Sequence, residues 1–208
     1  RAIQKKIDDL KKKLEGVLCS RREQRKGRQG RAVCALVGYT NAGKSALLNA
    51  LTGSSKLVED KLFATLDPAV RRFRLPDGVT VLISDTVGFI SKLPPQLVAA
   101  FRATLEEVQE ADVLLHTIDI AEPGVEERVA EVMRTLKELK AERKPTVSVL
   151  NKVDLVPNRL RVHKYKKYPN AVPVSARTGE GLDKLAEMIA KVLRSSWVPA
   201  RVALHHTQ

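Results

Sequence analysis

From residue 31 onward, short apolar runs rich in β-branched residues alternate with longer segments whose apolar positions recur at helical spacing. The short runs predict strands at Ala32–Val37, Ala69–Leu75, Val79–Ser84, Asp112–Asp119, Thr146–Leu150 and Ala171–Val174. The longer segments predict helices at Lys44–Leu51, Gln96–Glu110, Val125–Ala141 and Leu182–Leu193. Such alternation is typical of an α/β fold, here a mostly parallel six-stranded sheet with helices on both faces. The tight turn Pro76-Asp77-Gly78 makes the second and third strands an antiparallel hairpin.

The first 30 residues follow a different pattern. Charged residues separate five apolar positions that recur in steps of four and three, namely Ile3, Ile7, Leu10, Leu14 and Val17. This spacing predicts the apolar seam of a coiled-coil-like helix, which is marginal alone and should pack against another helix. We therefore expect three parts: a basic helical segment and linker at 1–30, the α/β domain at 31–195, and a tail at 196–208.

The net charge of +13 is distributed unevenly. Residues 1–31 contain twelve Lys or Arg against four Asp or Glu. A second basic run consists of Arg159, Arg161, Lys164, Lys166 and Lys167. Two local basic zones favour a polyanionic partner. For the second zone, nucleic-acid contact and a solvated loop are equally open.

Cysteine usage and hydropathy limit the cellular compartments that the sequence favours. Cys19 and Cys34 form neither a disulfide framework nor a metal-ligand spacing, which indicates a reducing environment. No apolar run approaches the roughly 18 to 20 residues of a membrane-spanning helix, so no membrane partner is expected. Because the chain begins with Arg1, we interpret it as part of a longer protein. A cytoplasmic location is predicted, and an organelle matrix stays open. Cys34 is interpreted as a core residue, and His116 as a packed or edge residue rather than a catalyst.

The strongest chemical motif is Gly38-Tyr39-Thr40-Asn41-Ala42-Gly43-Lys44-Ser45, which has the form GxxxxGKS. It follows a predicted strand and opens a predicted helix, the context in which such a loop binds nucleotide phosphates. Backbone N–H groups would surround the phosphates, Lys44 would supply positive charge, and Ser45 would give Mg²⁺ a hydroxyl ligand. The predicted phosphate-site residues are Gly38, Asn41, Ala42, Gly43, Lys44, Ser45 and Ala46.

Two further positions complete the predicted metal and phosphate site. Asp85-Thr86-Val87-Gly88 follows the third strand, where the carboxylate can hold Mg²⁺ through water and the Gly88 N–H can meet the γ-phosphate. Thr65 lies in a polar, irregular segment and is interpreted as the switch threonine, with an ordinary loop threonine as the alternative. We predict Ser45, Thr65 and Asp85 as metal ligands, and Lys44, Thr65 and Gly88 as catalytic residues.

The choice of base is predicted from Asn151-Lys152-Val153-Asp154, which directly follows an apolar strand. The Asp154 carboxylate can accept from both N1–H and the exocyclic amine of guanine, a pair of donors that adenine lacks. GTP is therefore favoured over ATP. Asn151 would tie this loop to the phosphate site, and the Lys152 stem would lie along the base. Ser175 and Ala176 follow the last strand, and the Ala176 N–H is expected to meet the guanine O6.

Beyond these motifs, the stretches FATLDP at 63–68, DTVGFISKLP at 85–94 and LVAAFRATLEE at 97–107 resemble the HflX family of ribosome-associated GTPases. The resemblance implies a Ras-like P-loop G domain, a longer native protein with an N-terminal helical hairpin, and binding to the large ribosomal subunit and its RNA. Some members of that family split stalled ribosomes under stress, so the resemblance makes this activity an expectation for the whole protein. The chain itself is expected to be monomeric. Ala46 departs from the family pattern, in which threonine is expected.

Phe89 stands where Ras-like proteins have a water-positioning glutamine, and a phenyl ring cannot orient water by hydrogen bonding. The resemblance implies that this is a family trait, with slow intrinsic turnover and a partner or an ion completing the site. Asn41 resembles the asparagine of potassium-activated GTPases, so K⁺ is one hypothesis. The alternative is that Asn41 only ties the loop backbone.

Two other functions remain as alternatives. A GTP-operated switch could recognise a protein effector through the coiled-coil-like helix. A P-loop ATPase is disfavoured by Asp154.

Overall fold

The computed structural model describes residues 30–53, 70–86, 107–156 and 165–196. The chain divides into two compact units, Arg1–Arg31 and Ala32–Gln208, and every element named below belongs to the second. None of the described helices is long and apolar enough to cross a membrane.

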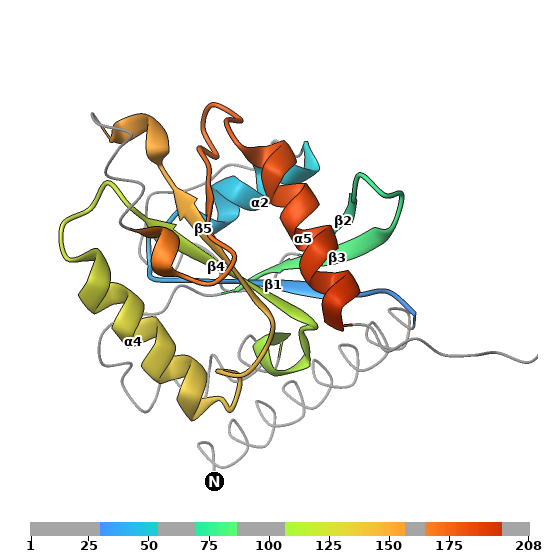
Figure 1. The fold of residues 1–208 in the computed structure, drawn as a ribbon, viewed down its shortest axis with the longest axis horizontal. Coiled ribbons are helices and arrows are strands. Elements are labelled where there is room, and N and C mark those ends of the chain that lie inside the picture. The colour runs from blue at the N-terminus through green and yellow to red at the C-terminus, as the bar shows by residue number, and fades with distance from the viewer. Residues whose placement is uncertain (1–29, 54–69, 87–106, 157–164, 197–208) are drawn as a thin grey trace, which may run out of the picture. The chain divides into compact units, whose positions relative to one another are not determined.

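A six-stranded sheet with the order β2-β3-β1-β4-β5-β6 organises this unit (Figure 1). All neighbouring strands are parallel except β2 and β3, which pair antiparallel. The strands are β1 (Val33–Val37), β2 (Val70–Arg74), β3 (Thr80–Asp85), β4 (Val113–Asp119), β5 (Thr146–Asn151) and β6 (Val172–Pro173). The predicted α/β class and the mostly parallel six-stranded sheet are therefore confirmed.

Among the described residues, three α-helices lie on the two faces of the sheet: α2 (Lys44–Thr52), α4 (Val125–Glu138) and α5 (Leu182–Ser196). Leu47 of α2 and Ile189 of α5 pack with Leu36 and Leu115 on one face. Alternate residues of the same strands point the other way, where they pack against α4. Figure 1 shows α4 and α5 on opposite sides of the sheet.

Helices α2, α4 and α5 begin at the predicted residues, but two of their ends differ from the prediction by three residues. α5 continues to Ser196 rather than ending at Leu193, and α4 stops early. α4 ends at Glu138 rather than at the predicted Ala141. The cause is Lys140, whose φ of 56° leaves the helical region, while the Ala141 N–H turns back to the Leu136 carbonyl. This is the usual hydrogen-bond closure at a helix end. The predicted helix Gln96–Glu110 lies mainly outside the described residues, and residues 107–110 are helical.

The predicted hairpin between β2 and β3 is present. Gly78 has a φ of +85°, which the turn requires, and its N–H donates to the Leu75 carbonyl at 2.9 Å. Arg194 of α5 donates to the Asp77 carboxylate at 2.7 Å and so joins the turn to the helix. Strand β2 stands at one end of the sheet order and carries three arginines, Arg71, Arg72 and Arg74.

The two residues that were interpreted as packed are buried. Cys34 is fully enclosed in β1, and burial raises the pKa of its thiol to about 12, which keeps it unreactive. His116 of β4 is 4% exposed.

Candidate functional site

Within the described residues, side chains at or just after the carboxyl ends of β1, β3, β4, β5 and β6 lie at one edge of the sheet. The glycine-rich loop (residues 38–45) follows β1, Asp85 ends β3, and Asp119 ends β4. Asn151 ends β5, and the segments 152–154 and 175–177 follow β5 and β6. Because parallel strands place their carboxyl ends together, residues far apart in sequence become neighbours here. The predicted Thr65, Gly88 and Phe89 lie outside the described residues.

The glycine-rich loop is shaped by close contacts that exclude side chains. A Cβ on Gly38 would collide with the Thr117 carbonyl, and a Cβ on Gly43 would collide with the Asn151 amide. Gly43 also has a φ of +89°, and Asn41 adopts a φ of 59°. No side chain caps the start of α2 at Gly43. The helix therefore begins with backbone N–H groups that can bind an anion.

Lys44 is buried at the centre of this loop, with 7% of its surface exposed. Its ammonium donates to the carbonyls of Tyr39 (3.0 Å) and Gly38 (3.3 Å). Burial lowers the pKa of Lys44 to about 8, and the Asp85 carboxylate acts in the opposite direction. The shift corresponds to about 3 kcal/mol against the charged form. At neutral pH the loop thus holds a cation that is poorly solvated, which favours an anionic ligand.

Ser45 and Asp85 meet directly. The Ser45 hydroxyl donates to Asp85 Oδ2 at 2.6 Å, and Asp85 is only 2% exposed. A hydroxyl and a carboxylate are hard oxygen donors of the kind that Mg²⁺ prefers. Within the described residues no group of three or more His, Cys, Asp or Glu could hold a metal ion. The donor set therefore fits a Mg²⁺ ion that takes its remaining ligands from phosphates and water.

Asn151 links three of the loops. Its Nδ2 donates to the Ala42 carbonyl at 2.9 Å, and its Oδ1 accepts from the Ala176 N–H at 3.1 Å. The predicted tie between Asn151 and the glycine-rich loop is present. The Ala176 N–H, which was expected to meet a base oxygen, is directed at Asn151, so a base would have to share this donor.

Lys152 and Asp154 are each held by charged neighbours. The Lys152 ammonium lies 2.7 Å from Asp119 Oδ2 and donates to the Asn41 carbonyl at 3.0 Å. The Asp154 carboxylate accepts from the Ser175 hydroxyl at 2.7 Å, and its other oxygen lies 3.1 Å from the Arg177 guanidinium. Both carboxylate oxygens are thus occupied by donors from the chain itself.

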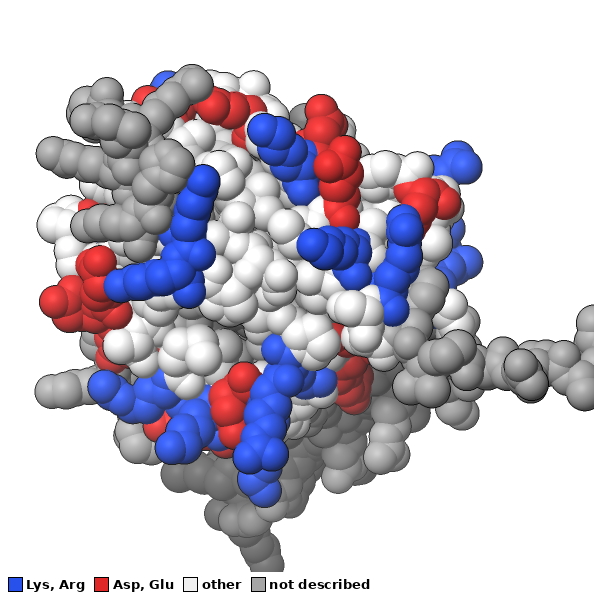
Figure 2. Space-filling view, in the orientation of Figure 1, with Lys and Arg blue, Asp and Glu red and all other residues white. Residues whose placement is uncertain are grey.

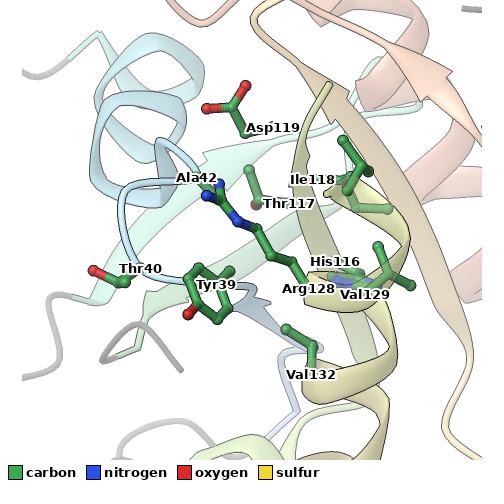
Figure 3. A pocket seen from close by; sticks show the side chains of 11 residues that line it. Tyr39, Thr40, Ala42, His116, Thr117, Ile118, Asp119, Arg128, Val129 and Val132 are labelled. Atoms are coloured by element: carbon green, nitrogen blue, oxygen red, sulfur yellow. The ribbon is translucent and has the colours of Figure 1, made fainter. Parts of the chain in front are cut away.

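A small cavity lies between the glycine-rich loop, β4 and α4 (Figure 3). The Arg128 guanidinium lies 5.2 Å from the centre of the Tyr39 ring, which joins α4 to the glycine-rich loop by a cation–π contact. His116 lines the same cavity. Burial, and to a smaller extent the charge on Lys44, lower the pKa of His116 to about 4. Its imidazole is neutral at pH 7, in agreement with a packed residue rather than a catalyst.

Comparisons with known proteins agree with this arrangement. A family model described as "50S ribosome-binding GTPase" matches residues 33–152. GTPase HflX from Magnetococcus marinus is 47% identical over 206 residues, which cover 98% of this chain and 48% of that protein. GTPase HflX from Chlamydia pneumoniae is 43% identical over 211 residues, which cover 100% of this chain and 45% of that protein.

The chain belongs to the HflX family of GTPases. It spans about half the length of the curated HflX relatives that it matches. Its fold is that of a Ras-like P-loop GTPase domain. A GTP-binding protein from Sulfolobus solfataricus in complex with GDP superimposes with a TM-score of 0.68 at 26% identity, covering 92% of this chain and 58% of that one.

A second solved relative of this HflX-family chain is Era in complex with MgGDPNP and nucleotides 1506–1542 of 16S ribosomal RNA. Its TM-score is 0.62 at 28% identity, with 84% of this chain and 59% of that one covered. Both solved relatives carry a guanine nucleotide.

Two residues of the site in this HflX-family chain were not predicted. Asp119 was assigned only as the end of a strand, although a carboxylate at the carboxyl end of a parallel strand is the same signal that drew attention to Asp85. Arg177 directly follows Ser175 and Ala176. No feature of the sequence indicates that Arg177 turns toward Asp154.

Proposed function

We propose that this chain binds GTP with Mg²⁺, hydrolyses it to GDP and phosphate, and through this cycle controls association with the large ribosomal subunit. The main support is the buried Asn151 side chain, which joins the glycine-rich loop to the loop that carries Ala176. Asn151 thereby links the loop before α2, which we assign to phosphate binding, to the segments that carry Asp154 and Ala176. The whole protein's role in splitting or rescuing ribosomes is part of the same proposal.

Guanine recognition is assigned to Asp154, with Ser175 holding its carboxylate. The Ser175 hydroxyl donates to Oδ1 at 2.7 Å, which orients the carboxylate plane. Arg177 is 76% exposed at its side chain, so its ion pair with Asp154 contributes at most about 1 kcal/mol and yields readily to a base. The two carboxylate oxygens can then accept from guanine N1–H and the exocyclic amine.

We predict that Asp154→Asn lowers GTP affinity by about tenfold or more, because a charge-assisted hydrogen bond to the base is lost. The same change should raise affinity for xanthosine triphosphate, whose 2-oxo group accepts where guanine donates. Fluorescence titration with labelled nucleotides measures both. Asp183→Asn, an exposed carboxylate on α5, is the matched control. Full GTP affinity in Asp154→Asn would overturn the assignment.

Phosphate binding is assigned to the glycine-rich loop, with Lys44 as its cation, and to Ala46 in the first turn of α2. The Lys44 ammonium would exchange the carbonyls of Tyr39 and Gly38 for phosphate oxygens, which relieves its poor solvation. Ser45 and Asp85 would hold Mg²⁺, the first directly and the second through water. When bound there, the ion would supply positive charge against the charge that develops on the transferred phosphoryl group. Thr65 and Gly88 are proposed to contact the γ-phosphate, and Thr65 to complete the metal shell.

We predict that Ser45→Ala and Asp85→Ala each lower Mg²⁺-dependent GTP binding or turnover by roughly 10- to 100-fold, a range typical for groups around a metal. Thermal melts should show that the loss occurs well below the unfolding temperature. Thr52→Ala removes a hydroxyl from the same helix, where it donates to the Leu48 carbonyl, and serves as control. Parent-like turnover in both site variants would show that these residues are not Mg²⁺ ligands.

A monovalent cation is proposed to complete the catalytic site. Asn41 adopts a φ of 59° at the rim of the glycine-rich loop and is exposed. Its side-chain oxygen could help to hold K⁺ between the phosphates, where an added positive charge stabilises the transition state as an arginine finger does.

We predict faster GTP turnover in K⁺ than in Na⁺ at equal ionic strength, because the larger ion fits a loose cage of oxygens. Asn41→Ala should abolish the difference and leave GDP affinity nearly unchanged. Asn170→Ala, at another asparagine with positive φ, should retain it. Equal rates in the two salts, both alone and with ribosomes, would discard the ion and favour a ribosomal group instead.

Ribosome association is supported by the family description and by the solved Era complex with ribosomal RNA. Figure 2 shows Lys and Arg interleaved with Asp and Glu on the visible face of the described residues, rather than gathered in one basic surface. We assign RNA contact to the two basic sequence zones at 1–31 and 159–167, because Lys and Arg are concentrated there along the chain. Both lie largely outside the described residues. A cytoplasmic, monomeric protein is part of this proposal.

We predict that a longer form of the protein, extended to the length of its HflX relatives, co-sediments with large subunits when loaded with a non-hydrolysable GTP analogue. Its binding should weaken steeply as the salt concentration rises. Phosphate contacts release counterions and so depend on salt, whereas an apolar helix seam does not. Small subunits and GDP-loaded protein are the controls, and the present chain is measured beside the longer form. Failure of the longer form to sediment with large subunits would overturn the ribosomal role. A partner bound independently of salt would instead support the coiled-coil switch.

A further inference from the structure

Asp119 is the last residue of β4 and lies beside the segment 151–154, to which base recognition is assigned. In the sheet register it lies opposite Asn151, the last residue of β5. Its Oδ1 accepts from the Ala121 N–H at 3.0 Å, and its Oδ2 lies 2.7 Å from the Lys152 ammonium. The Asp119 side chain is only 7% exposed. Both oxygens therefore have partners, and the carboxylate is fixed at a defined position.

Lys152 is held from two sides. Its ammonium pairs with Asp119 and also donates to the Asn41 carbonyl in the glycine-rich loop at 3.0 Å. The Lys152 backbone has a φ of 66°, which an L residue adopts only when its surroundings enforce it. The ammonium of one lysine thus bridges the end of β4 and the glycine-rich loop. Figure 3 places Asp119 and Ala42 toward the same end of the cavity beside that loop.

The bridge orders a side chain that would otherwise be free. A lysine has many rotamers, and fixing one of them on ligand binding reduces affinity. The ion pair with Asp119 fixes the Lys152 rotamer before a ligand arrives. Because Asp119 is buried and Lys152 is 26% exposed at its side chain, loss of the aspartate lets the ammonium turn to water. Loss of the lysine would instead leave a buried carboxylate without its cation, which is the costlier change.

We propose that Asp119 is a positioning residue for nucleotide binding, which acts by holding Lys152 against the base and against the glycine-rich loop. The inference rests on the proposed guanine-nucleotide binding and adds a residue to that site. Asp119 need not touch the nucleotide. Its effect on affinity passes entirely through Lys152.

The test is a double-mutant cycle on GDP affinity, with Asp119→Asn, Lys152→Met and the double variant measured beside the parent. Asparagine keeps the shape and can still accept from the Ala121 N–H, but it removes the charge that holds the ammonium. Asp119→Asn should weaken GDP binding by about tenfold. In the Lys152→Met background the same change should have less than about a twofold effect, because no ammonium remains to be positioned.

Glu122→Gln is the matched control. Glu122 lies three residues further along the same loop and pairs with Arg128 at 3.1 Å on the surface, so its substitution should leave GDP affinity unchanged. Unfolding transitions of all variants separate affinity from folding. If Asp119→Asn does not fold, the cycle is run with Asp119→Glu, which keeps the charge and displaces it by one methylene.

The outcomes are distinct. A parent that does not bind GDP overturns the proposed function itself. A parent that binds GDP, with Asp119→Asn within about twofold of it, overturns the role of Asp119. Losses that add in the double variant also overturn it, since a general effect on the fold would not depend on Lys152.

Discussion

The side-chain amide of Asn151 hydrogen-bonds to the Ala42 carbonyl and to the Ala176 N–H from a position that is 1% exposed. Through this one group, the loop after β1 and the loop after β6 are held at a fixed separation although β4 and β5 lie between these strands in the sheet. The same amide occupies the space of a Cβ on Gly43. The glycine and the asparagine are therefore one constraint, and the positions of Lys44 and Asp154 follow from it.

Much of this arrangement could be predicted because its causes are local. The run Thr146–Leu150 and the motif after it lie within a few residues of each other, so strand and site were predicted together. The hairpin turn at Asp77 and Gly78 depends on backbone preferences of the turn residues themselves. Parallel strands end at the same edge of a sheet. A correct assignment of the strands therefore also predicts that the motifs at their ends lie close together.

Other features depend on contacts between residues distant in sequence. The ion pair between Asp119 and Lys152 depends on the register of β4 with β5, which no local pattern encodes. The Lys44 ammonium donates to two carbonyls of its own loop. These partners depend on the three-dimensional path of the loop around the buried ammonium, which the motif alone does not specify. α4 stops at Glu138 because Lys140 takes a positive φ, whereas the helical periodicity continues beyond it. The predictions for Thr65, Gly88 and the helical seam at 1–20 lie outside the described residues.

The three arginines of β2 oppose self-association of the domain through this edge of the sheet. Strands at the ends of a sheet offer unpaired backbone groups that can template self-association. Among the described strands, β2 and β6 stand at the two ends of the order. Arg71, Arg72 and Arg74 would bring like charges together if two β2 edges met, whereas β6 is two residues long and contains Pro173, which lacks an N–H. Protection at β2 is electrostatic and weakens as salt rises; at β6 it is geometric and does not.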